Sequence, residues 1–190
     1  MSESLKIVID GPSGVGKTTI IHRLCEQNSN IKLSKSYTTR QIRNGETKGL
    51  EYEFISKEEF LQLKENNFFL EFENIFNEYY GTPDAITEDN HTIFNLNIDG
   101  VKKIKNNYKN SLLIFILPKS IDILKNRLNN RGCLHRFENI QQEFQNLDIF
   151  DHFVINENLD DAVAEINNLI LITEKNIKNK NLAKSYINIK

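Results

Sequence analysis

Residues Leu5–Leu24 read LKIVIDGPSGVGKTTIIHRL, and this stretch decides the fold. Its apolar, largely β-branched beginning, Leu5 and Ile7–Ile9, is typical of a buried parallel strand. Directly after it, Gly11–Thr18 fill every fixed position of the pattern G-x-x-x-x-G-K-[ST]. Apolar residues then recur at helical spacing, namely Ile20, Ile21 and Leu24. We therefore predict a strand, a glycine-rich loop and a helix in that order.

This succession predicts a binding site for a nucleoside triphosphate. Glycines let backbone N–H groups turn toward a phosphate chain, and a helix that starts at about Lys17 points the positive end of its dipole at the same anion. Lys17 adds a positive charge for the outer phosphates, and the Thr18 hydroxyl can join a Mg²⁺ shell. A chance glycine turn is disfavoured because the motif is complete and its flanks are correct. The expected contacts are Gly11, Pro12, Ser13, Gly14, Val15, Gly16, Lys17, Thr18 and Thr19.

Length and composition predict one globular domain without a membrane span. The chain has 190 residues, 39% hydrophobic and 26% charged, which is ordinary for a protein with a sizeable core. A formal charge of −2 gives no general attraction to nucleic acid or to anionic membranes, and no apolar run approaches the ~20 residues of a span. Cys25 and Cys133 lack metal or redox spacing, so we expect free thiols in the cytoplasm.

Alternating strand and helix patterns predict an α/β fold with a mainly parallel sheet flanked by helices. An antiparallel-looking block, Tyr37–Tyr80, is predicted as an insertion that holds a second substrate. A short helical segment is expected to start at Gly81–Pro83 and to reach about Glu88. Further strands are expected at Ile31–Thr38, His91–Ile98, Ser111–Leu117 and Phe153–Ile155, with a helix at Leu159–Thr173 and a frayed or loosely docked lysine-rich tail after Glu174.

The insertion contains side chains that suit a phosphate group. Arg40 and Arg43 can grip phosphate oxygens in bidentate fashion, and the hydroxyls of Ser36, Tyr52 and Tyr80 can complete the shell. Two arginines three residues apart are also common on a solvated surface. Taken alone, the pair favours that simpler interpretation.

Across nearly its whole length the chain resembles the guanylate kinase family. The second of the matching pieces is far more specific than the phosphate loop, which many families share. The pieces, in the order in which the family has them, are GPSGVGKTT at Gly11–Thr19, S-x-TTR-x-x-R-x-GE-x-x-G-x-x-Y-x-F at Ser36–Phe54, FLE at Phe69–Glu71, YYGT at Tyr79–Thr82, R-x-x-x-RG at Arg127–Gly132 and VIN at Val154–Asn156.

The resemblance implies a three-layer P-loop NTPase fold and transfer of the γ-phosphoryl group of ATP to GMP or dGMP, with Mg²⁺ as cofactor. It implies one domain, residues 1–190, with a core at 1–35, 91–128 and 150–173, a mixed-β GMP-binding lobe at 36–90 and a short lid at 129–149, which leaves a basic tail at 174–190. We expect ATP and GMP as partners, neither nucleic acid nor membrane, and a monomer or homodimer.

The resemblance also assigns roles to single residues. Guanine presents two donors, N1–H and N2–H₂, that one carboxylate can accept, and an O6 that a hydroxyl can satisfy. These contacts fall on Glu71 and Thr82. The GMP-binding set is Ser36, Arg40, Arg43, Tyr52, Glu71, Tyr80, Thr82 and Asn97. The expected catalytic set is Lys17, Arg40, Arg127, Arg131 and Arg136, and Asn156 is expected to contact adenine.

Two features depart from the family pattern. Asn95 and Asn97 stand where the family usually has aspartates, and alternation along the expected strand places both with Asp99 on one face. In the lid, the chain between Gly132 and Phe153 is several residues shorter than usual, and Cys133-Leu134-His135 replace the acidic, Thr-rich start that the family has there. Asn97 motivates an alternative, a kinase for another nucleotide or a phosphosugar. A second alternative is an inactive guanylate-kinase-like module that binds a phosphopeptide, against which the intact Gly16-Lys17-Thr18 argues.

Overall fold

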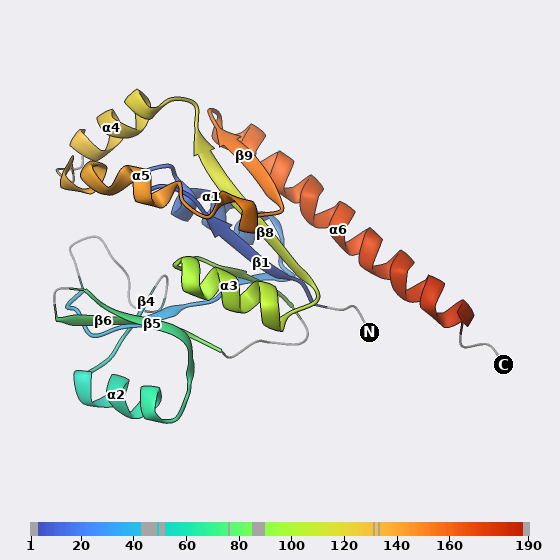
Figure 1. Ribbon diagram of the computed structural model, residues 1–190, viewed down its shortest axis with the longest axis horizontal. Helices are drawn as coiled ribbons and strands as arrows, with labels where there is room; N and C mark the ends of the chain where they lie inside the picture. Colours follow the sequence, from blue (N-terminus) through green and yellow to red (C-terminus); the bar gives the residue numbers. More distant parts are fainter. Residues whose placement is uncertain are drawn as a thin grey trace.

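A computed structural model describes residues 4–42, 49, 52–75, 77–84, 90–130, 132 and 134–187. The side chains of residues 136, 139 and 187 are outside this description. The described residues form a parallel sheet, a second mixed sheet and helices that pack on both (Figure 1).

The parallel sheet carries the core of the molecule. Its strand order is β2-β7-β1-β8-β9, and each neighbouring pair runs parallel. This arrangement confirms the α/β fold with a mainly parallel sheet. The strands are β1 (Lys6–Asp10), β2 (Ile31–Leu33), β7 (His91–Phe94), β8 (Ser111–Pro118) and β9 (His152–Asn156).

Alternate residues of the inner strands face two separate apolar clusters. Ile7 and Ile9 of β1 belong to a cluster with α1 (Lys17–Gln27) and α6 (Leu159–Ile187). Val8, between them, faces the other side and packs with α3 (Ile98–Asn107). Helices therefore cover both faces, which gives three layers. Each fully buried side chain of this kind contributes about 1.5–3 kcal/mol to folding.

The second sheet forms a lobe beside the parallel sheet. Its order is β4-β3-β6-β5, with β3 and β4 parallel and the other pairs antiparallel. The strands are β3 (Ser36–Thr38), β4 (Tyr52–Phe54), β5 (Phe69–Ile75) and β6 (Glu78–Pro83). The helix α2 (Lys57–Glu65) begins after its N-cap Ser56, whose Oγ accepts the Glu59 N–H at 3.1 Å. Leu70 of β5 joins the α3 cluster and so ties the lobe to the core.

The segment between the last two parallel strands consists of short helices. They are α4 (Ile121–Asn130), η1 (Leu134–Asn139), α5 (Ile140–Glu143) and η2 (Leu147–Ile149). In Figure 1, α4 and α5 lie at the same end of the molecule as the start of α1. The assignment of residues 129–149 as a lid stays a prediction.

Three of the predicted strand and helix boundaries are wrong. The predicted single strand at Ile31–Thr38 consists of two strands, β2 and β3, in different sheets. The chain leaves the parallel sheet at Ser34, whose N–H donates the last hydrogen bond to β7, to the Ile93 carbonyl at 2.8 Å. Gly81–Pro83 continue β6 instead of starting a helix, and residues 85–89 are outside the described part. The strand β7 ends at Phe94 and α3 begins at Ile98, so Asp99 is helical and does not extend a strand face.

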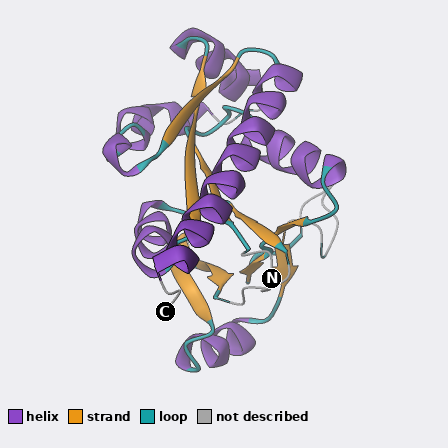
Figure 2. Ribbon diagram, turned by 90° about the vertical axis from the view of Figure 1, so that its right-hand side faces the viewer, coloured by secondary structure: helices purple, strands orange, loops and turns teal. Residues whose placement is uncertain are grey.

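The C-terminal helix is much longer than predicted. Instead of ending at Thr173 and fraying, α6 continues to Ile187 and crosses in front of the long strands in Figure 2. The helix contains no proline or glycine. A hydrogen bond of 2.6 Å between His91 Nε2 and Glu174 Oε1 holds it to β7. In the described part of the chain, no helix combines the length and the apolar character needed to cross a membrane.

Candidate functional site

The loop between β1 and α1 requires its glycines. Gly11, Gly14 and Gly16 have φ angles of 145°, 84° and 111°, which side chains rarely tolerate. A Cβ at Gly11 would also lie 2.5 Å from the carbonyl oxygen of Ile116, and one at Gly16 would lie 2.5 Å from Asn156 Nδ2. The loop therefore closes tightly against β8 and β9, a close approach that the sequence alone did not indicate.

Charged groups of opposite sign lie at the base of this loop. Lys17 Nζ donates to the Gly11 carbonyl, and Asp10 Oδ1 accepts the Gly11 N–H at 2.7 Å. Burial raises the pKa of the Asp10 carboxyl, the Lys17 ammonium partly offsets that rise, and the Glu143 carboxylate adds to it. The Lys17 ammonium can attract phosphate oxygens, and an added cation would stabilise the ionised form of the Asp10 carboxyl.

Two polar side chains support the loop from behind. Asn156 Nδ2 and Arg127 Nη1 both donate to the carbonyl of the fully buried Val15, at 2.8 and 3.2 Å. Neither residue is among those that line the cavity described below. The predicted adenine contact of Asn156 and the predicted phosphoryl contact of Arg127 therefore stay predictions, while the structure assigns both a supporting position.

A contact that the sequence reasoning missed reaches the loop from α5. The Ser13 N–H donates to Glu143 Oε2 at 2.5 Å, across 130 residues of chain. Backbone N–H groups of such a loop normally donate to phosphate oxygens. A carboxylate therefore takes a position suited to an anion. No local sequence signal pairs these two residues.

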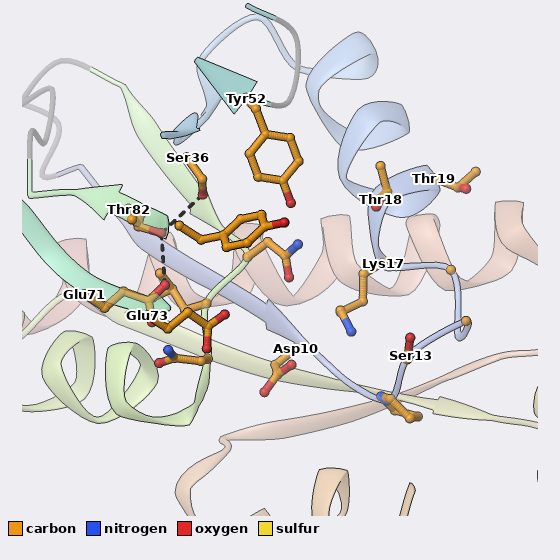
Figure 3. Close-up of a pocket in the computed structure, with 18 of the residues that line it drawn as sticks. Asp10, Ser13, Lys17, Thr18, Thr19, Ser36, Tyr52, Glu71, Glu73 and Thr82 are labelled. Carbon is orange, nitrogen blue, oxygen red and sulfur yellow. Dashed lines mark hydrogen bonds between the residues drawn. The ribbon is translucent and has the colours of Figure 1, made fainter. Parts of the chain in front are cut away.

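In the lobe, three side chains form a hydrogen-bonded series (Figure 3). Thr82 Oγ1 donates to Glu71 Oε1 at 3.0 Å and lies 3.2 Å from Ser36 Oγ. Burial raises the pKa of Glu71 to about 7, although the Thr82 hydroxyl lowers it. The other carboxylate oxygen, Oε2, is buried without a well-formed hydrogen bond among the described residues, although the backbone N–H of Asn97 interacts with the carboxyl and lowers its pKa. An unsatisfied buried acceptor of this kind is suited to a ligand that donates hydrogen bonds.

Aromatic rings flank Arg40, which is the arginine of the predicted acceptor-phosphate site that lies within the described residues. The guanidinium carbon of Arg40 lies 5.1 Å from the ring centroid of Tyr52 and 5.4 Å from that of Phe54. The Tyr52 and Tyr80 rings meet edge to face at 6.2 Å. Of these residues, Tyr52 and Tyr80 line the cavity and Arg40 does not. Of the remaining predicted arginines, Arg43 and Arg131 are outside the described residues, as is the side chain of Arg136.

A single cavity of about 490 Å³ joins the loop to the lobe (Figure 3). It brings together most of the predicted loop residues with Ser36, Tyr52, Glu71, Tyr80 and Thr82. From the loop and the start of α1 it is lined by Asp10, Pro12, Ser13, Gly14, Gly16, Lys17, Thr18 and Thr19, and elsewhere also by Glu73, Gly81, Asn95, Leu96, Asn97 and Leu128.

Two of these lining residues change the interpretation of the sequence. Asn97 was predicted on a strand, yet it is the N-cap of α3, where its Oδ1 accepts the Gly100 N–H at 3.0 Å. Glu73 was not singled out, although it follows Glu71 by two residues on β5. The two-residue period of strands was the signal that could have identified it.

The fold and the cavity define a P-loop nucleotide-binding protein of the α/β class, since a glycine loop with its lysine follows the central strand of a parallel sheet. The guanylate kinase family model matches residues 3–172. The chain therefore belongs to the guanylate kinase family, which confirms the resemblance noted in the sequence.

Individual relatives agree with this assignment. A guanylate kinase of Caldanaerobacter subterraneus is 39% identical over 91% of this chain and 89% of its own length, and one of Rickettsia prowazekii is 36% identical over 90% and 92%. The crystal structure of guanylate kinase from Anaplasma phagocytophilum superposes with a TM-score of 0.73 at 26% identity, covering 92% of this chain and 88% of that one. A gluconokinase from Sinorhizobium meliloti, with a TM-score of 0.52 and 10% identity, shares the fold.

Proposed function

We propose that this chain transfers the γ-phosphoryl group of ATP to GMP, giving ADP and GDP. One observation carries the proposal: a phosphate-binding loop and a buried carboxylate–hydroxyl pair line the same cavity. Two nucleotides bound at its two sides would place their phosphates toward each other. Membership in the guanylate kinase family supports the same reaction.

The Glu71–Thr82 pair recognises guanine in this proposal. An ionised Glu71 accepts hydrogen bonds from N1–H and N2–H₂, which satisfies the buried Oε2, and the Thr82 hydroxyl turns to O6. Adenine lacks these donors and would leave the carboxylate unpaired. Such a mismatch costs about 1–3 kcal/mol, or roughly 5-fold to 150-fold in affinity.

The acceptor phosphate lies, in this proposal, among the hydroxyls of Ser36, Tyr52 and Tyr80 and the arginines Arg40 and Arg43. The stacking of Arg40 on Tyr52 supports this, because a guanidinium held over aromatic rings keeps its edge directed while its charge stays available to an anion. The triphosphate of ATP lies on the loop, and Asn97 lies at the nucleoside end of the acceptor site.

Mg²⁺ is the proposed cofactor, and the residues present fit it. The Thr18 hydroxyl is exposed at the first turn of α1, and the Asp10 carboxylate lines the same cavity, so both offer the oxygen atoms that Mg²⁺ prefers. When bound, the ion neutralises charge on the β- and γ-phosphates. The chain itself holds the triphosphate through backbone N–H groups of the loop and through the Lys17 ammonium.

The chemical step needs positioning and positive charge rather than a protein nucleophile. We assign charge stabilisation on the transferred group to Lys17, Arg40, Arg127, Arg131 and Arg136. For Arg127 this requires the guanidinium to exchange the Val15 carbonyl for a phosphoryl oxygen. We further expect a monomer or homodimer that works in the cytoplasm.

A steady-state assay of ADP formation with GMP, dGMP, AMP, UMP and CMP tests the proposal. GMP should give the highest kcat/KM among these bases. Lys17→Ala should abolish turnover and leave GMP binding measurable, whereas Lys109→Ala, at an exposed lysine outside the lining residues, should change neither. Highest activity with AMP, UMP or CMP would favour a different acceptor. GMP binding without any ADP formation would favour the inactive binding module.

A further inference from the structure

Glu73 is a second carboxylate in the cavity, and the recognition of guanine does not use it. It lies two residues after Glu71 on β5, so strand geometry directs both side chains to the same face of the lobe sheet. Both line the cavity, and Figure 3 shows Glu73 beside Glu71. Glu73 is exposed, yet its negative charge acts on the Glu71 carboxyl within the cavity and raises the pKa of Glu71.

The pairing of β5 with β6 locates Glu73 along the acceptor nucleotide. Glu71 is opposite Thr82, and Glu73 is opposite Tyr80. The first pair is the proposed guanine site, and Tyr80 belongs to the proposed phosphate site. Two residues of a strand advance by about 6.8 Å. In a nucleoside monophosphate the ribose joins the base to the phosphate. In the proposed site the phosphate meets the hydroxyl at the tip of the Tyr80 side chain and not the Tyr80 backbone, so we place Glu73, one such step from Glu71, at the level of the ribose.

We propose that Glu73 accepts a hydrogen bond from a ribose hydroxyl of the acceptor and makes the enzyme prefer GMP to its deoxy analogues. An ionised carboxylate can only accept hydrogen bonds, and at this level of the nucleotide the hydroxyls at C2′ and C3′ are the donors. Carboxylates recognise ribose in the same way in dinucleotide-binding folds. Without a donor, the carboxylate would face the acceptor phosphate as an uncompensated like charge.

This inference rests on the proposed function, and its test separates the two. kcat/KM is measured for GMP, 2′-deoxy-GMP and 3′-deoxy-GMP with the wild type, Glu73→Ala, Glu73→Gln and the control Glu65→Ala, an exposed carboxylate of α2. The wild type should disfavour at least one deoxy analogue by roughly tenfold or more, the size expected of a hydrogen bond to a charged group. Glu73→Ala should bring that ratio close to one, Glu73→Gln should give an intermediate value, and Glu65→Ala should retain the wild-type ratio.

The ratio between nucleotides is informative because a merely structural role of Glu73 would lower activity on all three equally. Equal kcat/KM for the three nucleotides in the wild type, or a preference that persists in Glu73→Ala, would overturn the inference. If a variant loses turnover, calorimetric titration with GMP and the deoxy analogues gives the same ratio from dissociation constants. Failure of the wild type to phosphorylate GMP at all would instead overturn the proposed function.

Discussion

Lowering the pH below 7 should weaken binding of the guanine base, because Glu71 must ionise before it can accept two hydrogen bonds. Burial raises the pKa of this carboxyl to about 7 in the protein without nucleotide. At pH 6 roughly one molecule in eleven is then ionised, and the dissociation constant should be about tenfold higher than at pH 8 and above.

Calorimetric titration from about pH 6 to about pH 8 measures this effect. Guanosine is the decisive ligand, since the phosphate of GMP has a pKa of about 6 and titrates in the same range. Binding near pH 6 should also release close to one proton per guanosine, which the dependence of the heat on the buffer reveals. Glu71→Gln should bind more weakly and show little pH dependence, since its amide does not ionise here.

The same ionisation predicts the pH dependence of folding stability. The pKa of Glu71 is about 7 in the folded chain and about 4.5 unfolded, so the folded state binds the proton more tightly. The contribution of Glu71 to the free energy of unfolding is fully present below about pH 4.5 and is lost as the pH rises through 7. The loss amounts to at most about 3 kcal/mol. Glu71→Gln should therefore exceed the wild type in free energy of unfolding at pH 8. A flat guanosine profile, or one that Glu71→Gln retains, would refute the reasoning.

Three further substitutions test the contacts around the cavity. Glu143→Gln should tighten binding of a non-hydrolysable ATP analogue several-fold by removing a competing carboxylate from the loop, whereas Gln142→Ala on the same helix should not; weaker binding would contradict this. Gly100→Ala should raise the KM for GMP about tenfold, because the new Cβ would lie 2.9 Å from Glu71 Oε2 and displace that side chain. Urea denaturation should nevertheless show equal or higher stability, because alanine favours a helix more than glycine does. Asn97→Ala should lower the free energy of unfolding by about 1 kcal/mol through loss of the helix cap, and unchanged stability would exclude that role.

The phosphate loop was predictable from the sequence because its determinants are local. Gly11, Gly14 and Gly16 all have positive φ angles, and the strand and helix around them follow directly from apolar spacing. The lobe was different. Glu71 and Thr82 meet only through the pairing of β5 with β6, so the resemblance to a family, rather than any spacing rule, brought them together in advance.

The errors have related physical causes. The chain changes sheets after Leu33, and no local pattern distinguishes one bent strand from two short strands in different sheets. Asn97 fits a strand by alternation, but its side chain caps α3, which is a common use of asparagine. The polar end of α6 predicted a frayed or loosely docked tail, whereas packing of Ile177 on the core and the contact of Glu174 with His91 hold the helix in place beyond its predicted end at Thr173.

The charges around the cavity support the proposed role of the arginines outside it. Among the described lining residues, Asp10, Glu71 and Glu73 can be negative, and Lys17 is the only lysine or arginine. Two phosphorylated nucleotides add several more negative charges to this space. In the proposed reaction, the positive charge that offsets them comes from Mg²⁺ and from arginines such as Arg40, which stacks on a lining tyrosine. The affinity for both nucleotides together should consequently depend more steeply on these arginines than the affinity for uncharged guanosine.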